Sequence, residues 1–227
     1  IIIDESWLRS STPDGLIDPS NQYTCILCDR HYVFSGGGVC VFVSKVYTVV
    51  VIDLADIYPE LEICCFDLMF ESCRCTVFAV YRAPSCDSSH MSRLLECLCK
   101  FSDVGYHCII AGDMNCPGVD WVSLKAPADN VQDALLDFAV TRSFSQIVDS
   151  PTRLDNTLDI VLTSEPLAIC NANVIEPFST SDHCQVEFSV FNDCAATAEG
   201  CDDIVKRYDW SGADCDAMSS YIAGVDW

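Results

Sequence analysis

The segment IIAGDMNCPGVDW, residues 109–121, joins an apolar run to an acid, an amide and a proline–glycine turn. Residues 109–112 have the composition of a buried strand that ends at Asp113. Side chains at positions i and i+2 of an extended chain share one face, so Asp113 and Asn115 should point in the same direction. The segment predicts a strand whose end carries a polar site, although these two residues could also cap the turn into CPG.

Further segments predict buried strands, because they are rich in Val, Ile, Phe and Cys and are bounded by turn residues. They are residues 1–7, 36–44, 61–70, 75–84, 107–115, 157–164 and 184–191. Two amphipathic segments predict helices: residues 88–101, with Ser88 or Ser89 as N-cap, and residues 129–143, with Asp129 or Asn130 as cap. Because strands outnumber helices and the two kinds are interspersed, we expect an α/β fold with two packed sheets and helices outside.

Composition sets limits on the class of protein. The 227 residues suit one large domain or two small ones, and no segment approaches the roughly 18 apolar residues that a membrane-spanning helix needs. Most of the 17 cysteines lie in apolar segments, where a thiol packs as a small hydrophobic group, so we expect reduced thiols and an intracellular protein. Cys25 and Cys28 have the spacing of half a zinc site, but no second pair follows at finger spacing.

The sequence changes character after Phe191, where small, polar and acidic residues replace the strand patterns. We therefore predict one domain over residues 1–191, followed over residues 192–227 by an acidic linker and a short terminal segment. The chain opens within an apolar segment and without Met, which predicts a fragment of a longer protein.

The net charge of −22 argues against a protein that holds a polyanion through its overall electrostatic field. Three explanations stay open. The partner is not a bare nucleic acid, the acids gather around metal ions, or the basic contacts belong to sequence beyond this chain.

Polar residues recur at the ends of the predicted strands. They are Glu5, Tyr81, Arg82, Asp113, Asn115, Asp159, Asp182 and His183. If the sheets bring these ends together, the result is a cup with several carboxylates, which repel one another unless a cation lies among them. Oxygen ligands favour Mg²⁺, with Mn²⁺ next. A metal, a histidine and an asparagine around one cavity suit the attack of water on a phosphate ester.

Each of these residues also has a purely structural interpretation. Glu5 and Asp159 could be ordinary acids at a turn or a strand edge, and Tyr81 could be an aromatic residue at the rim of the core. The tripeptide SDH, residues 181–183, could be a turn that enters a strand, and PTRLDNT, residues 151–157, is typical of a loop. The motifs gain weight only when their order along the chain is considered.

Six motifs, in this order, resemble the endonuclease/exonuclease/phosphatase superfamily: DESWL, GGGVCVFV, VYRAP, IIAGDMNCPGVDW, DSPTRLDNTLDIVLTS and PFSTSDHCQVEFSV. More narrowly, they resemble the apurinic-type endonuclease domain of non-LTR retrotransposon polyproteins. The resemblance covers Ile1 to about Phe191, and the terminal segment resembles the connector that precedes the reverse transcriptase. It implies a four-layered α/β sandwich and a divalent metal. It also implies a further strand before Ile1, so we expect the N-terminal strand to be missing here and activity to be weak.

The resemblance also implies a role for each matching residue. Glu5 and Asp182 match metal-binding acids, and Tyr81 matches a tyrosine that contacts the scissile phosphate. Asp113 matches the acid that activates water and Asn115 its phosphate-orienting neighbour, while Asp159 holds His183, which stabilises the phosphate. Residues predicted to bind substrate are Arg82, Arg153, Asn156 and Ser181.

The implied activity is a magnesium-dependent DNA endonuclease that nicks target DNA and leaves a 3′-hydroxyl for target-primed reverse transcription. Its partners would be DNA and the reverse transcriptase of the same polyprotein, with no stable protein partner, and it would act in the nucleus. Two alternatives remain: an inactive truncated remnant, and a phosphodiesterase of the same fold acting on a lipid or inositol phosphate.

Overall fold

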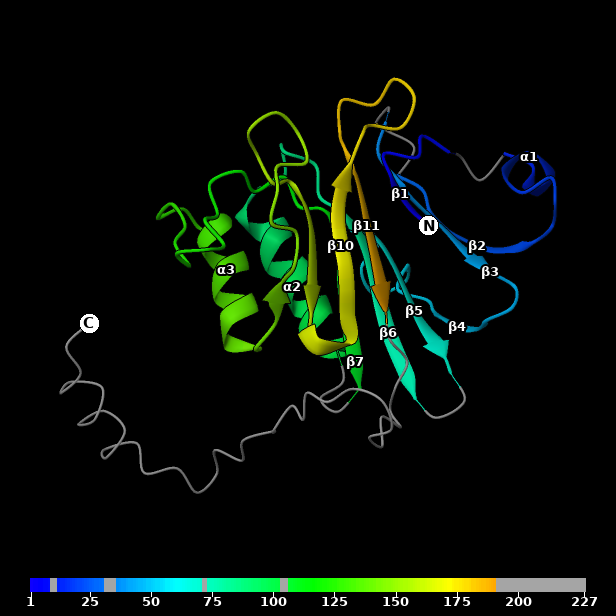
Figure 1. Ribbon diagram of the computed structural model, residues 1–227, viewed down its shortest axis with the longest axis horizontal. Helices are drawn as coiled ribbons and strands as arrows, with labels where there is room; N and C mark the ends of the chain where they lie inside the picture. Colours follow the sequence, from blue (N-terminus) through cyan, green and yellow to red (C-terminus); the bar gives the residue numbers. More distant parts are fainter. Residues whose placement is uncertain (9–11, 31–35, 71–72, 103–105, 191–227) are drawn as a thin grey trace. The chain divides into compact units, whose positions relative to one another are not determined.

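The computed structural model describes residues 1–8, 12–30, 36–70, 73–102 and 106–190 (Figure 1). All of them lie in the first of the two units of the chain, Ile1–Cys194. The predicted linker and terminal segment, residues 192–227, lie outside the described residues. The elements are β1 (Ile2–Asp4), α1 (Asp14–Ile17), β2 (Tyr23–Cys28), β3 (Val39–Ser44), β4 (Thr48–Ile52), β5 (Glu62–Met69), β6 (Arg74–Tyr81), α2 (Ser88–Phe101), β7 (His107–Asp113), α3 (Gln132–Thr141), β8 (Ser145–Gln146), β9 (Asp159–Thr163), the 3-10 turn η1 (Pro166–Ala168), β10 (Ile169–Ile175) and β11 (Gln185–Val190).

A six-stranded mixed sheet with the order β4-β5-β6-β7-β9-β8 forms the centre. Strand β7, predicted from IIAGD, lies between β6, to which it is parallel, and β9, to which it is antiparallel. The carboxyl end of β7 therefore meets the amino end of β9, and Asp113 pairs with Asp159 in the register. This pairing places two acids from distant parts of the sequence side by side.

One face of this sheet packs against a second layer of strands. That layer contains the antiparallel sheet β1-β3-β2 and the antiparallel pair β10-β11. Buried residues of β3, including Val39 and Val41, share a hydrophobic core with Phe66, Val77 and Ile109 of the central sheet. Side chains of β10 and β11 are partly buried against the same core, and Figure 1 shows this pair in front of the central sheet. Each fully buried large side chain stabilises such a core by roughly 1.5–3 kcal/mol.

The opposite face of the central sheet is covered by α2 and α3 (Figure 1). Their apolar faces pack onto Phe78, Ile110 and Leu162 of the sheet. The bounds predicted for α2 agree with the structure, but its N-cap is Asp87, whose carboxylate accepts the backbone N–H of His90, and not Ser88 or Ser89. For α3, the Asp129 carboxylate accepts the backbone N–H groups of Val131 and Gln132, as a capping acid does.

The predicted α/β class, with two packed sheets and helices outside, is confirmed. Four strands were not predicted: β2, β4, β8 and β10. Both β4 and β8 are edges of the central sheet. Strand β8 has only two residues, whereas β4, with the sequence TVVVI, is an apolar run that is nevertheless largely exposed at its edge. Strand β10 is interrupted by Asn171, whose φ is 52°, and its pairing with β11 shifts between Cys170 and Asn173.

The described cysteines form no disulfides, and many of them are core thiols, as expected. Burial raises the pKa of Cys116 to about 11 and that of Cys108 to about 12, so these groups stay protonated and uncharged in the core. Among the described helices, none combines the length and the apolarity that crossing a membrane requires.

Gly112, next to the predicted polar site, has a φ of 139°, which side chains of L-residues rarely adopt. A Cβ at this position would overlap the carbonyl group of Val80 in β6. We expect Gly112→Ala to lower the free energy of unfolding by about 3 kcal/mol, because the end of β7 must move away from β6. Urea denaturation followed by circular dichroism measures this change.

The neighbouring reverse substitution, Ala111→Gly, is the control. It removes one methyl group and adds backbone freedom without a clash, so a loss of only about 1–2 kcal/mol is expected. Equal losses for the two variants would show that the close approach of β7 and β6 is unimportant.

Candidate active site

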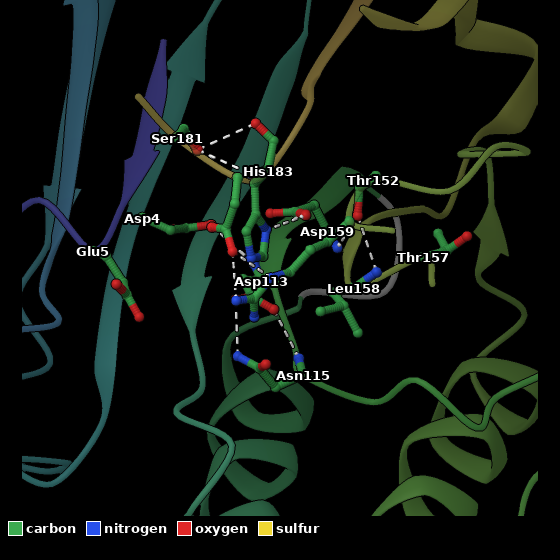
Figure 2. Close-up of polar contacts among 12 residues, drawn as sticks. Asp4, Glu5, Asp113, Asn115, Thr152, Thr157, Leu158, Asp159, Ser181 and His183 are labelled. Carbon is green, nitrogen blue, oxygen red and sulfur yellow. Dashed lines mark hydrogen bonds and ion pairs between the residues drawn. The ribbon is translucent and has the colours of Figure 1, made fainter. Parts of the chain in front are cut away.

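The core of the candidate site is the pair of acids at the meeting point of β7 and β9 (Figure 2). Asp113 is 5% exposed, and its carboxylate accepts the backbone N–H and the side-chain amide of Asn115 at 2.9 and 2.8 Å. Burial, and secondly the charge of Asp159, raise the pKa of Asp113 to about 6. The turn-capping interpretation of Asp113 and Asn115 therefore holds, and the same bonds fix the acid in place.

Asn115 itself adopts a φ of 48°, a conformation that Asn tolerates better than most residues. Its amide nitrogen also donates to the carbonyl oxygen of Arg82 at 2.9 Å, and the N–H of Arg82 donates to the carbonyl oxygen of Asp113. The ends of β6 and β7 are thus tied together at the site.

His183 completes the site from the loop that precedes β11. Its Nδ1 lies 2.8 Å from Oδ2 of Asp159, and its backbone N–H donates to Oγ of Ser181 at 3.0 Å. The hydrogen bond to Asp159 is the main reason that the pKa of His183 is raised. Asp159 therefore orients the imidazole and favours its cationic form.

Asp113, Asp159 and His183 can each offer one ligand atom within 4.8 Å of the others, and they form the group in the described chain that could hold a metal ion. Carboxylate oxygens and an imidazole nitrogen suit a divalent cation. The raised pKa of Asp113, caused in part by Asp159, shows that the acids repel each other without one.

Two residues near the site were missed by sequence reasoning. Asp4, at the end of β1, accepts the backbone N–H of Asp113 at 2.9 Å. The sequence signal for its inward position was strand alternation, because Asp4 shares a face with the partly buried Ile2. Thr152 is fully buried, and its Oγ1 accepts the N–H groups of both Leu158 and Asp159 at 3.0 Å. Its carbonyl oxygen also accepts the N–H of Cys184, so Thr152 links β9 to the His183 loop; no sequence pattern predicted this role.

Glu5 and Tyr81 form a separate pair. The hydroxyl of Tyr81 donates to the carboxylate of Glu5, which is an exposed residue and does not belong to the group of three potential ligands. Burial first, and then Glu5, raise the pKa of Tyr81. Figure 2 shows Glu5 apart from the other site residues, whereas Asp4 is directed toward Asp113 and His183. In this arrangement the carboxylate of Glu5 bonds to Tyr81 and lies outside the group that could hold a metal, so the structure gives no support to its predicted role as a metal ligand.

The remaining predicted residues lie outside the group. Asp182 is exposed and forms an ion pair with Arg153 at 2.6 Å. Arg82 is 2% exposed and donates to the carbonyl oxygens of Met114 and Cys86, so its burial does not fit the predicted contact with substrate. Asn156 forms backbone hydrogen bonds with Thr152 and Arg153 that close the loop, and no described contact assigns a role to its side chain.

Comparison with known proteins gives a family and a fold. The family model described as endonuclease-reverse transcriptase matches residues 75–187, which include every residue of the potential metal group. A comparison with curated protein sequences gives no significant match.

Several solved structures share the fold. The endonuclease domain of TRAS1, a telomere-specific non-LTR retrotransposon, is 16% identical, with a TM-score of 0.59 over 75% of this chain and 80% of that one. An AP endonuclease from Archaeoglobus fulgidus is 15% identical, with a TM-score of 0.61 over 84% of this chain and 88% of that one. The 3′-5′ exonuclease NExo from Neisseria meningitidis is also 15% identical, with a TM-score of 0.55 and the same coverage.

The raised pKa of Asp113 predicts a pH-dependent stability. A carboxyl whose folded pKa of about 6 lies above its ordinary value of 3.8 contributes stability that is complete below pH 3.8 and is lost as the pH rises through 6. In metal-free buffer at pH 8, Asp113→Asn should therefore raise the free energy of unfolding by about 2 kcal/mol. This is the roughly 3 kcal/mol of the shift minus about 1 kcal/mol for the weakened bond to Asn115.

Urea denaturation at pH 8 and pH 4 tests this expectation, with chelator present. At pH 4 the gain should vanish, because Asp113 is then protonated in the native protein. The exposed Asp155→Asn serves as the control and should change stability by less than about 0.5 kcal/mol at both pH values. A variant of Asp113 that is less stable than the native protein at pH 8 would contradict the analysis.

Proposed function

This chain belongs to the endonuclease/exonuclease/phosphatase superfamily, and from that premise we propose that it is a metal-dependent DNA endonuclease. The observation that carries the proposal is the convergence of Asp113, Asp159 and His183. The two acids lie at adjacent strand ends of the central sheet, and the histidine comes from the loop before β11 in the layer packed on it. One acid is held by an amide, the other holds a histidine, and the two acids could share a cation. Hydrolysis of a phosphate ester needs these groups around one cavity.

Within this proposal the chain's own groups have separate tasks. Asp113, fixed by two hydrogen bonds from Asn115, accepts the proton of the attacking water. Asp159 holds the Nδ1 side of His183, so Nε2 is the nitrogen that can donate to a phosphate oxygen. The cationic form of His183, favoured by Asp159, offsets the negative charge that develops on the phosphate.

The residues present fit a divalent cation, and oxygen ligands favour Mg²⁺, with Mn²⁺ as the substitute. The carboxylates of Asp113 and Asp159 would hold it, because both nitrogens of His183 are already assigned, one to Asp159 and one to the phosphate. When bound, the cation would polarise the phosphate and favour ionisation of the attacking water.

DNA as the substrate is supported by the relatives in fold, which include an AP endonuclease and the endonuclease domain of a non-LTR retrotransposon. The description of the matching family joins an endonuclease to a reverse transcriptase. We therefore propose that the chain is a domain of a retrotransposon polyprotein. Its nick would leave a 3′-hydroxyl that primes reverse transcription by the same polyprotein, in the nucleus where the target DNA lies.

A plasmid assay tests the proposed function. The native chain should convert supercoiled plasmid to the nicked form with Mg²⁺ and not with chelator. Asp113→Asn and His183→Ala should each slow nicking by about 10²–10⁴-fold, because each removes a group that acts only in the transition state. The matched control is Asp137→Asn, which alters an exposed acid on α3 and should nick like the native chain.

Other outcomes would contradict the proposal in distinct ways. Metal-dependent nicking that persists in both site variants would place the chemistry elsewhere. Hydrolysis of a lipid or inositol phosphate by a chain that leaves DNA intact would favour the other phosphodiesterase activity. Hydrolysis of neither substrate by a folded chain would favour an inactive remnant.

A further inference from the structure

Asp4 connects the two sheets at the candidate site. It is the last residue of β1 in the three-stranded sheet, yet its Oδ2 accepts the backbone N–H of Asp113 at the end of β7 in the central sheet. Figure 2 shows its side chain directed toward Asp113 and His183. A carboxylate from the second sheet therefore faces the acids of the first.

The other oxygen of Asp4 has no described partner. Oδ1 exposes no surface to solvent and makes no hydrogen bond among the described residues. Burying a carboxylate oxygen without a donor or a cation is costly, by several kcal/mol in general. A buried acceptor without a partner, on a carboxylate beside other acids, is therefore unexplained unless a positive group binds there.

The local charge balance indicates what is missing. Asp4 accepts the N–H of Asp113, which pairs with Asp159 in the register, so three carboxylates gather at one place. The imidazole of His183 contacts this group through Asp159. One imidazolium cannot neutralise three carboxylates, whereas a divalent cation added to it can.

Asp4, like Glu5, is not one of the three residues whose ligand atoms lie within 4.8 Å of one another. We propose that Asp4 is nevertheless a ligand of the divalent cation and contributes Oδ1 when a cation binds to Asp113 and Asp159. This inference rests on the proposed function, and it names a ligand that the resemblance did not assign. Oδ2 stays on the N–H of Asp113, so one carboxylate both positions the acid of β7 and binds the cation.

Glu5, the residue that follows β1, is the competing candidate. It lies outside the strand, so its direction is shown by its own backbone conformation and contact. Glu5 is exposed, has a φ of 52° and accepts the hydroxyl of Tyr81. The structure therefore assigns the inward position to Asp4.

Calorimetric titration of the full chain with Mn²⁺ tests the proposal without relying on nuclease activity. Asp4→Asn keeps an oxygen that can accept the N–H of Asp113 but removes the charge. It should weaken Mn²⁺ binding by at least about 10-fold, as loss of a charged ligand does. In chelator the variant should be at least as stable as the native chain, because one of three repelling charges is gone. Asp4→Ser is a second variant, with the same expected loss of affinity.

Two control variants keep the interpretation specific. Glu5→Gln alters the neighbouring acid, and Asp67→Asn alters a buried acid that accepts the hydroxyl of Thr76 at the opposite end of β6 from Tyr81. Each should change Mn²⁺ affinity by less than about 3-fold.

The proposal is overturned if Asp4→Asn and Asp4→Ser bind Mn²⁺ as the native chain does, if Glu5→Gln loses as much affinity, or if the native chain binds no Mn²⁺. The function and this inference can fail separately. Native nicking combined with unchanged Mn²⁺ affinity of the Asp4 variants would leave the function intact and remove Asp4 from the site. Mn²⁺ binding that depends on Asp4 in a chain that does not nick DNA would uphold the ligand and refute the endonuclease.

Discussion

Mutual repulsion of buried carboxylates is the constraint on which the rest of the site depends. Asp4, Asp113 and Asp159 lie near one another, and burial first, then the charges of neighbouring acids, raise the pKa values of Asp4 and Asp113. The fold resists this repulsion with backbone and side-chain donors that fix each acid: the N–H of Asp113 for Asp4, Asn115 for Asp113 and the imidazole of His183 for Asp159. A site built in this way favours any added positive charge, which is the physical basis of the cation dependence that we propose.

Two sheets share the work of forming the site. The central sheet supplies Asp113 and Asp159 through the pairing of β7 with β9. The layer packed on it supplies Asp4 from β1 and His183 from the loop between β10 and β11. The hydrophobic core between the layers therefore sets the distances among the residues of the candidate site, and side chains far from the site affect it through packing.

The strongly negative net charge is compatible with a phosphate substrate once the local arrangement is considered. Several arginines are engaged by acids: Arg30 by Glu62, Arg93 by Glu60 and Glu96, and Arg153 by Asp182. Each of these ion pairs reduces the contribution of its arginine to a general field that attracts polyanions. Recognition of a phosphate would then depend on His183 and a bound cation at the site, and less on long-range attraction.

The local sequence determined the elements with regular patterns. The run IIAGD specified β7, the spacing of Met91, Leu94 and Leu98 specified α2, and the order of the motifs specified the superfamily. These features follow from neighbouring residues, since strand and helix periodicity are local. The sequence also singled out Asp113, Asn115, Asp159 and His183, because they lie at the ends of predicted strands within motifs whose order matches the superfamily.

Only the tertiary structure decided which of those residues meet. The register of β7 and β9 and the packing of β1 on β7 turned Asp4 inward and left Glu5 with Tyr81. The fold buries Arg82, although the sequence predicted a surface residue that contacts substrate. Thr152 links β9 to the His183 loop through hydrogen bonds from Leu158, Asp159 and Cys184, and no sequence pattern relates these residues to Thr152. Partners of this kind are set by sheet order and side-chain burial, which arise from contacts between remote segments and leave no local pattern in the sequence.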